Sequence, residues 1–433
     1  GSGVWSTANT ATATINSSGD VTGVAAGSTT LTYTVTDANG CTASVSSSMT
    51  VNAIPVVAAI TGTTEVCDGS TTALASATTG GVWTSSDNTI ASIDVNGVVT
   101  GEAAGTATIT YTVTTNGCTS SAQAVVNVNA LPTLAAIGGT MNACIGSATI
   151  LTNTTSGGVW TSSNAAVATV NSITGNVTGV TAGTATITYT YTNSNGCTSA
   201  VTTTVTINSL PVVAAITGTT SVCEGATTTL ASVTTGGVWS TANTATATID
   251  ASGVVTGVAA GTTTMTYTVT NANGCTSSVS TALVVNAIPQ VAAISGTTEV
   301  CAGSTTSLAN ATANGVWTSS NTAVATVSST GVVTGVAAGS TTITYTVTTN
   351  GCTANAQATV NVNALPVLAA IGGTMNACIG SSTILTNTTS GGVWTTSNAA
   401  VATVNSITGN VTGVTAGTAT ITYTYTNSNG CTS

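Results

Sequence analysis

Apolar and polar residues alternate along most of this chain, and the alternation predicts short β-strands. In the segment Thr106–Thr114, Ala, Ile, Tyr and Val occupy one side and Thr occupies the other. A period of two over this length is typical of an antiparallel strand with one buried face and one face in water. No stretch has the pattern of a helix of useful length, so we predict an all-β protein.

Similar short runs surround this strand and are separated by turn residues. The predicted strands of residues 54–130 are Val56–Ile60 and Thr63–Val66, which we interpret as one strand in two pieces, then Thr71–Ser76, Val82–Ser85, Ala91–Asp94, Val98–Thr100, Thr106–Thr114 and Ser120–Val128. Asn96-Gly97 and Asn116-Gly117 give the hairpin signals. Seven short strands with turns about every 8–12 residues predict an Ig-like β-sandwich.

This pattern occurs six times, and a tryptophan marks each copy at intervals of about 78 residues. The six positions are Trp5, Trp83, Trp160, Trp239, Trp317 and Trp394. A proline stands at each of five junctions, and because proline favours strand starts and edges, we place the repeat boundaries there. The prolines are Pro55, Pro132, Pro211, Pro289 and Pro366.

The predicted array therefore has six repeats joined by short, stiff connections. They are a partial repeat 1 (residues 1–53), repeat 2 (54–130), repeat 3 (131–209), repeat 4 (210–287), repeat 5 (288–364) and repeat 6 (365–433), which lacks its last strand. Because the end repeats are incomplete, we expect the natural chain to continue in both directions.

Charge removes several classes of function. The chain has no Lys, Arg or His, and its ten carboxylates give a net charge of -10. Nucleic-acid binding and polybasic membrane contact both need cations. No apolar run approaches the length of a membrane-spanning helix. Without His or Lys, and with the carboxylates scattered, the sequence also predicts no enzyme activity, no cofactor and no metal site.

One part of repeat 5 is similar to a known family. The run Val-Trp-Thr-Ser-Ser-Asn-Thr-Ala-Val-Ala-Thr-Val (316–327), the segment Gly331–Gly339 and Thr-Ile-Thr-Tyr345 resemble the bacterial Ig-like domain group 2 family. That family is found as β-sandwiches in intimin- and invasin-type adhesins. The Val-Cys-x-Gly and Asn-Gly-Cys-Thr elements resemble tandem repeats in large surface proteins of Bacteroidetes. The resemblance extends over the whole chain, and it implies fold more than function, because the module serves as a spacer in many proteins.

Eleven cysteines fall into two positional classes. One class follows the first strand of a repeat: Cys67, Cys144, Cys223, Cys301 and Cys378. The other opens the last strand after Asn-Gly: Cys41, Cys118, Cys197, Cys275, Cys352 and Cys431. With two cysteines per repeat, no His and no Cys-x-x-Cys, the pattern favours disulfides over metal binding.

Two pairings of these cysteines are open. Cysteines can pair within a repeat, as Cys67 with Cys118. If strands alternate in direction, however, these two positions lie at opposite ends of a sandwich, over about 20 Å apart. The end of one repeat abuts the start of the next, which favours inter-domain bonds. These are Cys67–Cys197, Cys144–Cys275, Cys223–Cys352 and Cys301–Cys431, with partners for Cys41, Cys118 and Cys378 expected in further repeats.

The tryptophans are predicted to be core anchors that face Tyr or Val of the penultimate strand. Since Phe is absent, Trp and Tyr are expected to supply most of the large apolar area of each core.

Together these features predict a rod-like, extracellular repeat region of a bacterial adhesin or filament, at the cell surface or secreted. This region would span distance and bear tension. Two alternatives remain: a self-assembling filament subunit that contacts neighbouring copies of the same chain, and a multivalent module that binds surface glycans.

Overall fold

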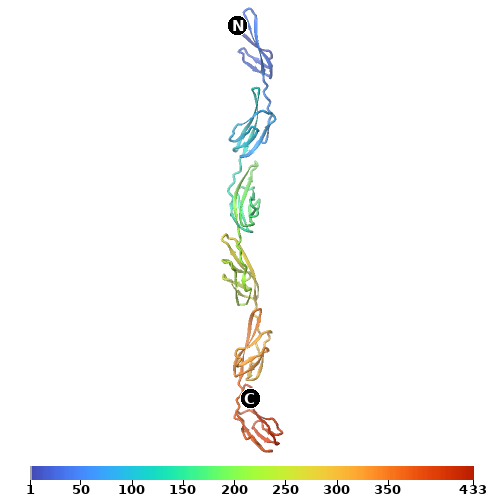
Figure 1. Ribbon diagram of the computed structural model, residues 1–433, viewed down its shortest axis with the longest axis vertical. Coiled ribbons are helices and arrows are strands. Elements are labelled where there is room, and N and C mark those ends of the chain that lie inside the picture. The colour runs from blue at the N-terminus through green and yellow to red at the C-terminus, as the bar shows by residue number, and fades with distance from the viewer. Residues whose placement is uncertain (1) are drawn as a thin grey trace. The chain divides into compact units, whose positions relative to one another are not determined.

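The computed structural model describes residues 2–433. All the regular elements in this range are β-strands (Figure 1). The predicted all-β class is therefore confirmed. The chain divides into two compact units, Gly1–Leu210 and Pro211–Ser433, which hold three repeats each. Within residues 2–433, no helix is long and apolar enough to pass through a membrane.

The first unit contains 21 strands. Repeat 1 has β1 (Gly3–Thr7), β2 (Ala13–Ile15), β3 (Val21–Gly23), β4 (Gly27–Thr36) and β5 (Thr42–Val51). Repeat 2 has β6 (Ile60–Gly62), β7 (Glu65–Cys67), β8 (Thr71–Ser76), β9 (Val82–Ser85), β10 (Ala91–Ile93), β11 (Val98–Gly101), β12 (Gly105–Thr115) and β13 (Cys118–Asn129). Repeat 3 has β14 (Gly138–Gly139), β15 (Asn142–Cys144), β16 (Ala148–Thr152), β17 (Val159–Ser162), β18 (Ala168–Val170), β19 (Asn176–Gly179), β20 (Gly183–Thr192) and β21 (Thr198–Asn208).

The second unit follows the same order. Repeat 4 has β22 (Thr217–Gly218), β23 (Ser221–Cys223), β24 (Thr227–Ala231), β25 (Val238–Thr241), β26 (Ala247–Ile249), β27 (Val254–Gly257), β28 (Gly261–Thr270) and β29 (Thr276–Asn286). Repeat 5 has β30 (Ser295–Gly296), β31 (Glu299–Cys301), β32 (Thr305–Ala309), β33 (Val316–Ser319), β34 (Ala325–Val327), β35 (Val332–Gly335), β36 (Gly339–Thr349) and β37 (Cys352–Asn363). Repeat 6 has β38 (Gly372–Gly373), β39 (Ser382–Thr386), β40 (Val393–Thr396), β41 (Ala402–Val404), β42 (Asn410–Gly413) and β43 (Ile421–Thr424).

Each complete repeat is a sandwich of two four-stranded sheets. In repeat 2 the orders are β10-β11-β8-β6 and β7-β13-β12-β9, and repeats 3, 4 and 5 have the same arrangement. The long ribbon of β12 and β13 is antiparallel, with Thr115 opposite Cys118 at its tip. Asn116 and Gly117 form that tip with φ angles of 49° and 85°. Positive φ at both positions is the requirement of the tight hairpin that Asn-Gly predicts.

The first strand differs from its prediction. Val56–Ile60 was expected to be extended within a sheet, but the strand begins only at Ile60. Pro55 has no amide hydrogen to donate. Ala58, farther along this segment, bonds side chains instead: its N donates to Thr78 Oγ1 at 3.0 Å and its O accepts from Ser76 Oγ at 3.1 Å. These side-chain bonds replace the ladder that the pattern of this segment predicts.

The two pieces of the first strand belong to different sheets. β6 pairs with β8 and is antiparallel to it, whereas β7 pairs with β13 and is parallel to it. Gly62 ends β6 with φ 123°, and a Cβ there would stand 2.3 Å from Ala73 O. Glycine therefore permits the chain to cross from one sheet to the other. The parallel pair places the end of β7 beside the end of the last strand of the repeat.

Aliphatic side chains fill the centre of the cores of repeats 2, 4 and 5. In repeat 2, Val99, Ile109 and Val126 have no exposed surface, and Leu74 is 2% exposed. Trp83 is only partly buried and packs against this cluster. Trp239 and Trp317 are placed in the same way in repeats 4 and 5. The expectation that Trp and Tyr supply most of the large apolar area of each core is therefore corrected for repeats 2, 4 and 5, where the indole covers the edge of an aliphatic core.

Repeats 3 and 6 differ, because Trp160 and Trp394 are each only 4% exposed. The hairpin that follows is one residue longer in these repeats than in repeat 2. Its extra length lets Ser172 O accept a hydrogen bond from Trp160 N at 3.0 Å, and Ser406 O does the same for Trp394 N at 2.9 Å. The longer hairpin thus lies against the tryptophan strand and shields the indole.

A tyrosine partners each tryptophan across the sheet. The rings of Trp83 and Trp160 lie 4.4 and 4.5 Å from those of Tyr111 and Tyr189, tilted by 45° and 47°. Tyr111 Oη accepts a hydrogen bond from Gly81 N at 2.9 Å. A Cβ on Gly81 would lie 2.5 Å from the Tyr111 ring, so the tyrosine needs glycine at this position.

Candidate functional site at the repeat junctions

The cysteines of the first class lie where one repeat ends. β7 runs parallel to the end of β13, so that Cys67 stands opposite Asn129, the last strand residue before the linker. The same register places Cys301 opposite Asn363 in repeat 5 and Cys223 opposite Asn286 in repeat 4. Each first strand therefore carries its cysteine to the exit of its own repeat.

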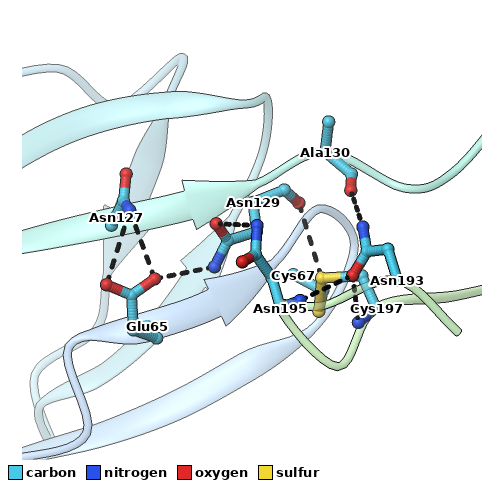
Figure 2. The surroundings of a disulfide bond; sticks show 8 residues. All are labelled: Glu65, Cys67, Asn127, Asn129, Ala130, Asn193, Asn195 and Cys197. Carbon is cyan, nitrogen blue, oxygen red and sulfur yellow. Dashed lines mark hydrogen bonds between the residues drawn. A yellow bond between two sulfur atoms is a disulfide. The ribbon is translucent and has the colours of Figure 1, made fainter.

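The structure joins these cysteines to the hairpin of the following repeat. Cys67 forms a disulfide with Cys197, with the Cα atoms 5.6 Å apart (Figure 2). The other bonds seen within a unit are Cys223–Cys352 and Cys301–Cys431, with Cα atoms 5.6 and 5.5 Å apart. These distances are normal for disulfides.

The remaining cysteines differ in state. Cys144 and Cys275 are both disulfide-bonded, and their bond to each other stays a prediction. Cys41, Cys118 and Cys378 carry free thiols, and Cys41 and Cys378 are exposed. Cys118, the partner that the intra-repeat alternative assigns to Cys67, is thus unbridged.

The hairpin that carries Cys197 is shaped by one asparagine. Asn193 Oδ1 accepts hydrogen bonds from the backbone N of Asn195 and of Cys197, both at 3.0 Å. Its Nδ2 donates to Ala130 O in the linker at 3.2 Å (Figure 2). A short side chain that bonds its own backbone in this way fixes a turn. Asn193 therefore both forms the hairpin and fastens it to the preceding repeat.

A second chain of amide contacts starts from the same hairpin. Asn195 Nδ2 donates to Asn129 Oδ1 at 2.9 Å. Asn129 Nδ2 in turn donates to Glu65 Oε2 at 2.7 Å, and Asn127 Nδ2 donates to the same oxygen at 3.2 Å (Figure 2). A charged acceptor strengthens such bonds. The carboxylate at the start of β7 thus orients the asparagine that meets the next repeat.

The junction of repeats 5 and 6 is built from equivalent residues. Glu299 accepts from Asn361 Nδ2 at 2.7 Å and from Asn363 Nδ2 at 2.9 Å. These two side chains, Asn361 first, hold the pKa of the Glu299 carboxyl below its usual value of 4.5. Asn427 Nδ2 donates to Ala364 O at 3.1 Å, as Asn193 does to Ala130.

Two other junctions use simpler contacts. Asn286 Nδ2 donates to Ser221 Oγ at 2.8 Å and to Asn350 O of the next hairpin at 3.4 Å. Between repeats 1 and 2, Asn52 Nδ2 donates to Asn116 O at 2.9 Å. The thiol sulfur of Cys118 lies 3.6 Å from Asn52 O. This junction therefore has the hairpin contact but no disulfide.

Sequence reasoning assigned no role to these asparagines beyond turns and strand ends. A signal was present, because an asparagine closes the last strand before every proline junction: Asn52, Asn129, Asn208, Asn286 and Asn363. The hairpins of repeats 3 and 6 also begin with asparagine, two residues before Asn-Gly-Cys. Recurrence at both sides of a junction indicates contact between the two sites.

Among residues 2–433, no three side chains of His, Cys, Asp or Glu come close enough to hold a metal ion. The carboxylates of Asp87 and Asp94 accept hydrogen bonds within their own turns. The bonds from Thr89 to Asp87 and from Val98 to Asp94 contribute most to lowering the pKa of each carboxyl below 3.8. The arrangement that the structure does show is suited to fastening one repeat to the next.

Replacing Asn193 with alanine is expected to loosen the hairpin. The change removes the acceptor for two amides and the bond to Ala130 O, so we expect a local loss of about 1–2 kcal/mol. Hydrogen exchange of the Cys197 amide in the oxidised chain should become about tenfold faster. Asn164→Ala is the matched control, because Asn164 caps a different turn of repeat 3 through Ala166 N. Unchanged exchange at Cys197 in Asn193→Ala would contradict this role.

The fold and the junctions define a class: tandem Ig-like β-sandwiches. The model of the bacterial Ig-like domain (group 2) matches residues 48–126, 146–205, 285–365 and 381–432, which is more than half of the chain. The chain belongs to this family, as the resemblance in its sequence implied. A search of curated proteins found no match.

Several solved structures resemble the chain distantly. Invasin, a bacterial integrin-binding protein, is 16% identical over 92% of this chain and 95% of its own, with a TM-score of 0.27. A SusE-like surface located polysaccharide binding protein from the Bacteroides thetaiotaomicron heparin utilisation locus is 12% identical over 82% and 78%, with a TM-score of 0.22.

The surface layer protein SbsC, domains 1–6, is 18% identical over 95% of this chain, with a TM-score of 0.16. The chain spans only 57% of that SbsC structure. Identities and TM-scores as low as these add no argument about function.

Proposed function

We propose that this chain is the structural repeat region of an extracellular bacterial adhesin or filament, which spans distance and bears tension while other parts of the protein bind. Each predicted repeat, with the boundaries given above, acts as one link. The observation that carries the proposal is the disulfide that fastens successive repeats within each unit, as Cys67–Cys197 does. A second covalent connection beside the linker resists bending and twisting at the junction.

The bonds also support the proposed location. Disulfides persist in oxidising surroundings and are rare where cellular thiols keep cysteines reduced. Three disulfides within the two units are therefore consistent with a place at the cell surface or in a secreted filament. Membership in a family of bacterial Ig-like domains agrees with this location and with a role without enzymatic activity.

Small-angle X-ray scattering tests the proposal on the oxidised chain. Last strands of 11–12 residues make each repeat roughly 40 Å long, so a rod-like array of six predicts a maximum dimension over about 200 Å. Dithiothreitol should shorten the mean end-to-end distance, since reduced junctions bend more freely. A compact particle in oxidised buffer would contradict the spacer function.

One feature favours a second candidate, lateral association. The outward face of β20 and β21 in repeat 3 presents hydroxyls in register and no charge: Thr184, Thr186, Thr188 and Thr192 stand opposite Thr206, Thr204, Thr202 and Thr198. No charged side chain on this pair of strands would repel a second copy laid against the face. Electron microscopy of concentrated protein would show ordered bundles if copies assemble, and a glycan array would show binding if this face recognises sugars instead.

A further inference from the structure

The disulfides attach at two particular places in each sandwich. One sulfur ends the first strand of a repeat, as Cys223 ends β23, and its partner stands at the start of the last strand of the following repeat, as Cys352 does in β37. In the folded repeat 5, the first strand β31 and the last strand β37 therefore connect the two neighbouring junctions. The strands β32 to β36, between Cys301 and Cys352, are not needed for that connection.

The loops closed by successive bonds overlap. Cys223–Cys352 encloses Cys301, and Cys301–Cys431 encloses Cys352, each at a sequence separation of about 130 residues. Two covalent routes consequently pass through repeat 5. The first route enters from repeat 4 through the disulfide at Cys352 and continues along β37. The second route enters along the backbone, follows β31 and leaves to repeat 6 through the disulfide at Cys301.

The strands that carry the two routes are hydrogen-bonded neighbours. β31 and β37 are parallel, with Glu299 opposite Asn361 and Cys301 opposite Asn363. Both strands point along the chain in the same direction, so tension acts on both along their length. While the sandwich is folded, its other strands support this pair without being part of either route.

We infer that the disulfides limit how far the array can extend under tension, because the covalent route through them leaves out most of the residues even when the sandwiches unfold. From Cys197 to Cys223 the backbone has about 26 residues, with a contour of roughly 90 Å at 3.3–3.6 Å per residue. Each disulfide bypasses about 130 residues, whose contour would be roughly 450 Å. Unfolding therefore adds much less length than it would in a chain without these bonds. This inference rests on the proposed load-bearing function and assigns its load path.

Across the whole chain the effect is large. In the unfolded chain the shortest covalent route uses Cys67–Cys197, Cys223–Cys352 and Cys301–Cys431, and between the last two it runs back along the backbone from Cys352 to Cys301. It holds about one third of the residues, so the fully extended length falls from roughly 1,500 Å to roughly 500 Å. Reduction releases the difference: each disulfide takes two electrons and two protons from dithiothreitol and becomes two thiols, while dithiothreitol closes into its cyclic disulfide.

The test is force–extension of the chain held by its two ends in concentrated guanidinium, with and without dithiothreitol. Chymotryptic mapping of the same sample first establishes the pairs, since trypsin has no Lys or Arg to cleave. We expect the oxidised contour to be about one third of the reduced contour. Equal contours in the two buffers, or recovery of intra-repeat pairs such as Cys67–Cys118, overturn the inference.

Cysteine variants test the route more specifically, because each removed disulfide should change the oxidised contour by a defined length. Cys301→Ser combined with Cys431→Ser should lengthen the oxidised contour by only roughly 100 Å, because the route then continues along β37 and through repeat 6. A gain of roughly 450 Å, the length of the whole opened loop, would overturn the two-route arrangement. Cys41→Ser is the matched control, because Cys41 is free and exposed, and it should change nothing. A negative result in this experiment would overturn the load path only, because the spacer function is tested separately by scattering.

Discussion

Replacing Trp160 with alanine is expected to destabilise repeat 3 by about 3–5 kcal/mol, the usual cost of deleting a buried aromatic side chain. The indole is 4% exposed, belongs to the buried cluster of repeat 3 and packs 4.5 Å from the Tyr189 ring. The hairpin that contains Ser172 is hydrogen-bonded to Trp160 N. This bond limits how far the surrounding residues can move to fill the cavity left by the indole. Hydrogen exchange of the β20 and β21 amides in the full chain measures the loss within this one repeat.

Two further variants sharpen this prediction. Trp83→Ala should cost repeat 2 clearly less, because that indole is only partly buried at the edge of its core. Val159→Ala is the control, since Val159 precedes Trp160 on the same strand but is 52% exposed, and the change should stay within about 0.5 kcal/mol. Equal losses for Trp160→Ala and Val159→Ala would contradict the placement of the indole.

Opening the Cys67–Cys197 bond is expected to have the second large effect. The bond closes a loop of 130 residues that contains most of repeats 2 and 3. In the chain-entropy model such a loop stabilises the folded state by up to about 5 kcal/mol, and measured values are commonly about 2–4 kcal/mol. Urea denaturation of the Cys67→Ser and Cys197→Ser double variant should therefore show a lower midpoint for these repeats.

The control for this experiment is Cys378→Ser, which removes a free and exposed thiol. It should unfold like the parent chain in oxidising buffer. Dithiothreitol should lower the midpoints of the parent and of Cys378→Ser equally. Identical midpoints for the parent and the double variant would show that the bond does not constrain the unfolded chain.

The sequence predicts this fold well where alternation is regular. Thr106–Thr114 alternates with almost no exception, and the structure extends that strand by one residue at each end, to Gly105–Thr115. Val56–Ile60 is instead an unbroken apolar run, and only Ile60 of it joins a sheet. The hydrophobic pattern indicates which residues can be buried. A segment joins a sheet only if its backbone N–H and C=O groups also find partners on a neighbouring strand.

The junctions were only partly predictable, and strand direction explains which part. Alternating strands place Cys67 and Cys118 at opposite ends of a sandwich, and that argument depends only on strand lengths. The structure indeed brings Cys67 to Cys197. The contact of Asn195 with Asn129 depends on side-chain orientation across two repeats, which no periodicity reports. The burial of Trp160 depends on one extra residue in a neighbouring hairpin, whose effect appears only when the hairpin is placed.

The junctions are held by sulfur and by neutral amides rather than by ion pairs, and no residue of the chain could supply a basic partner. Dissolved ions weaken attraction between opposite charges but leave a bond between two amides almost untouched. Links built in this way should hold equally firmly in fresh water and in brine.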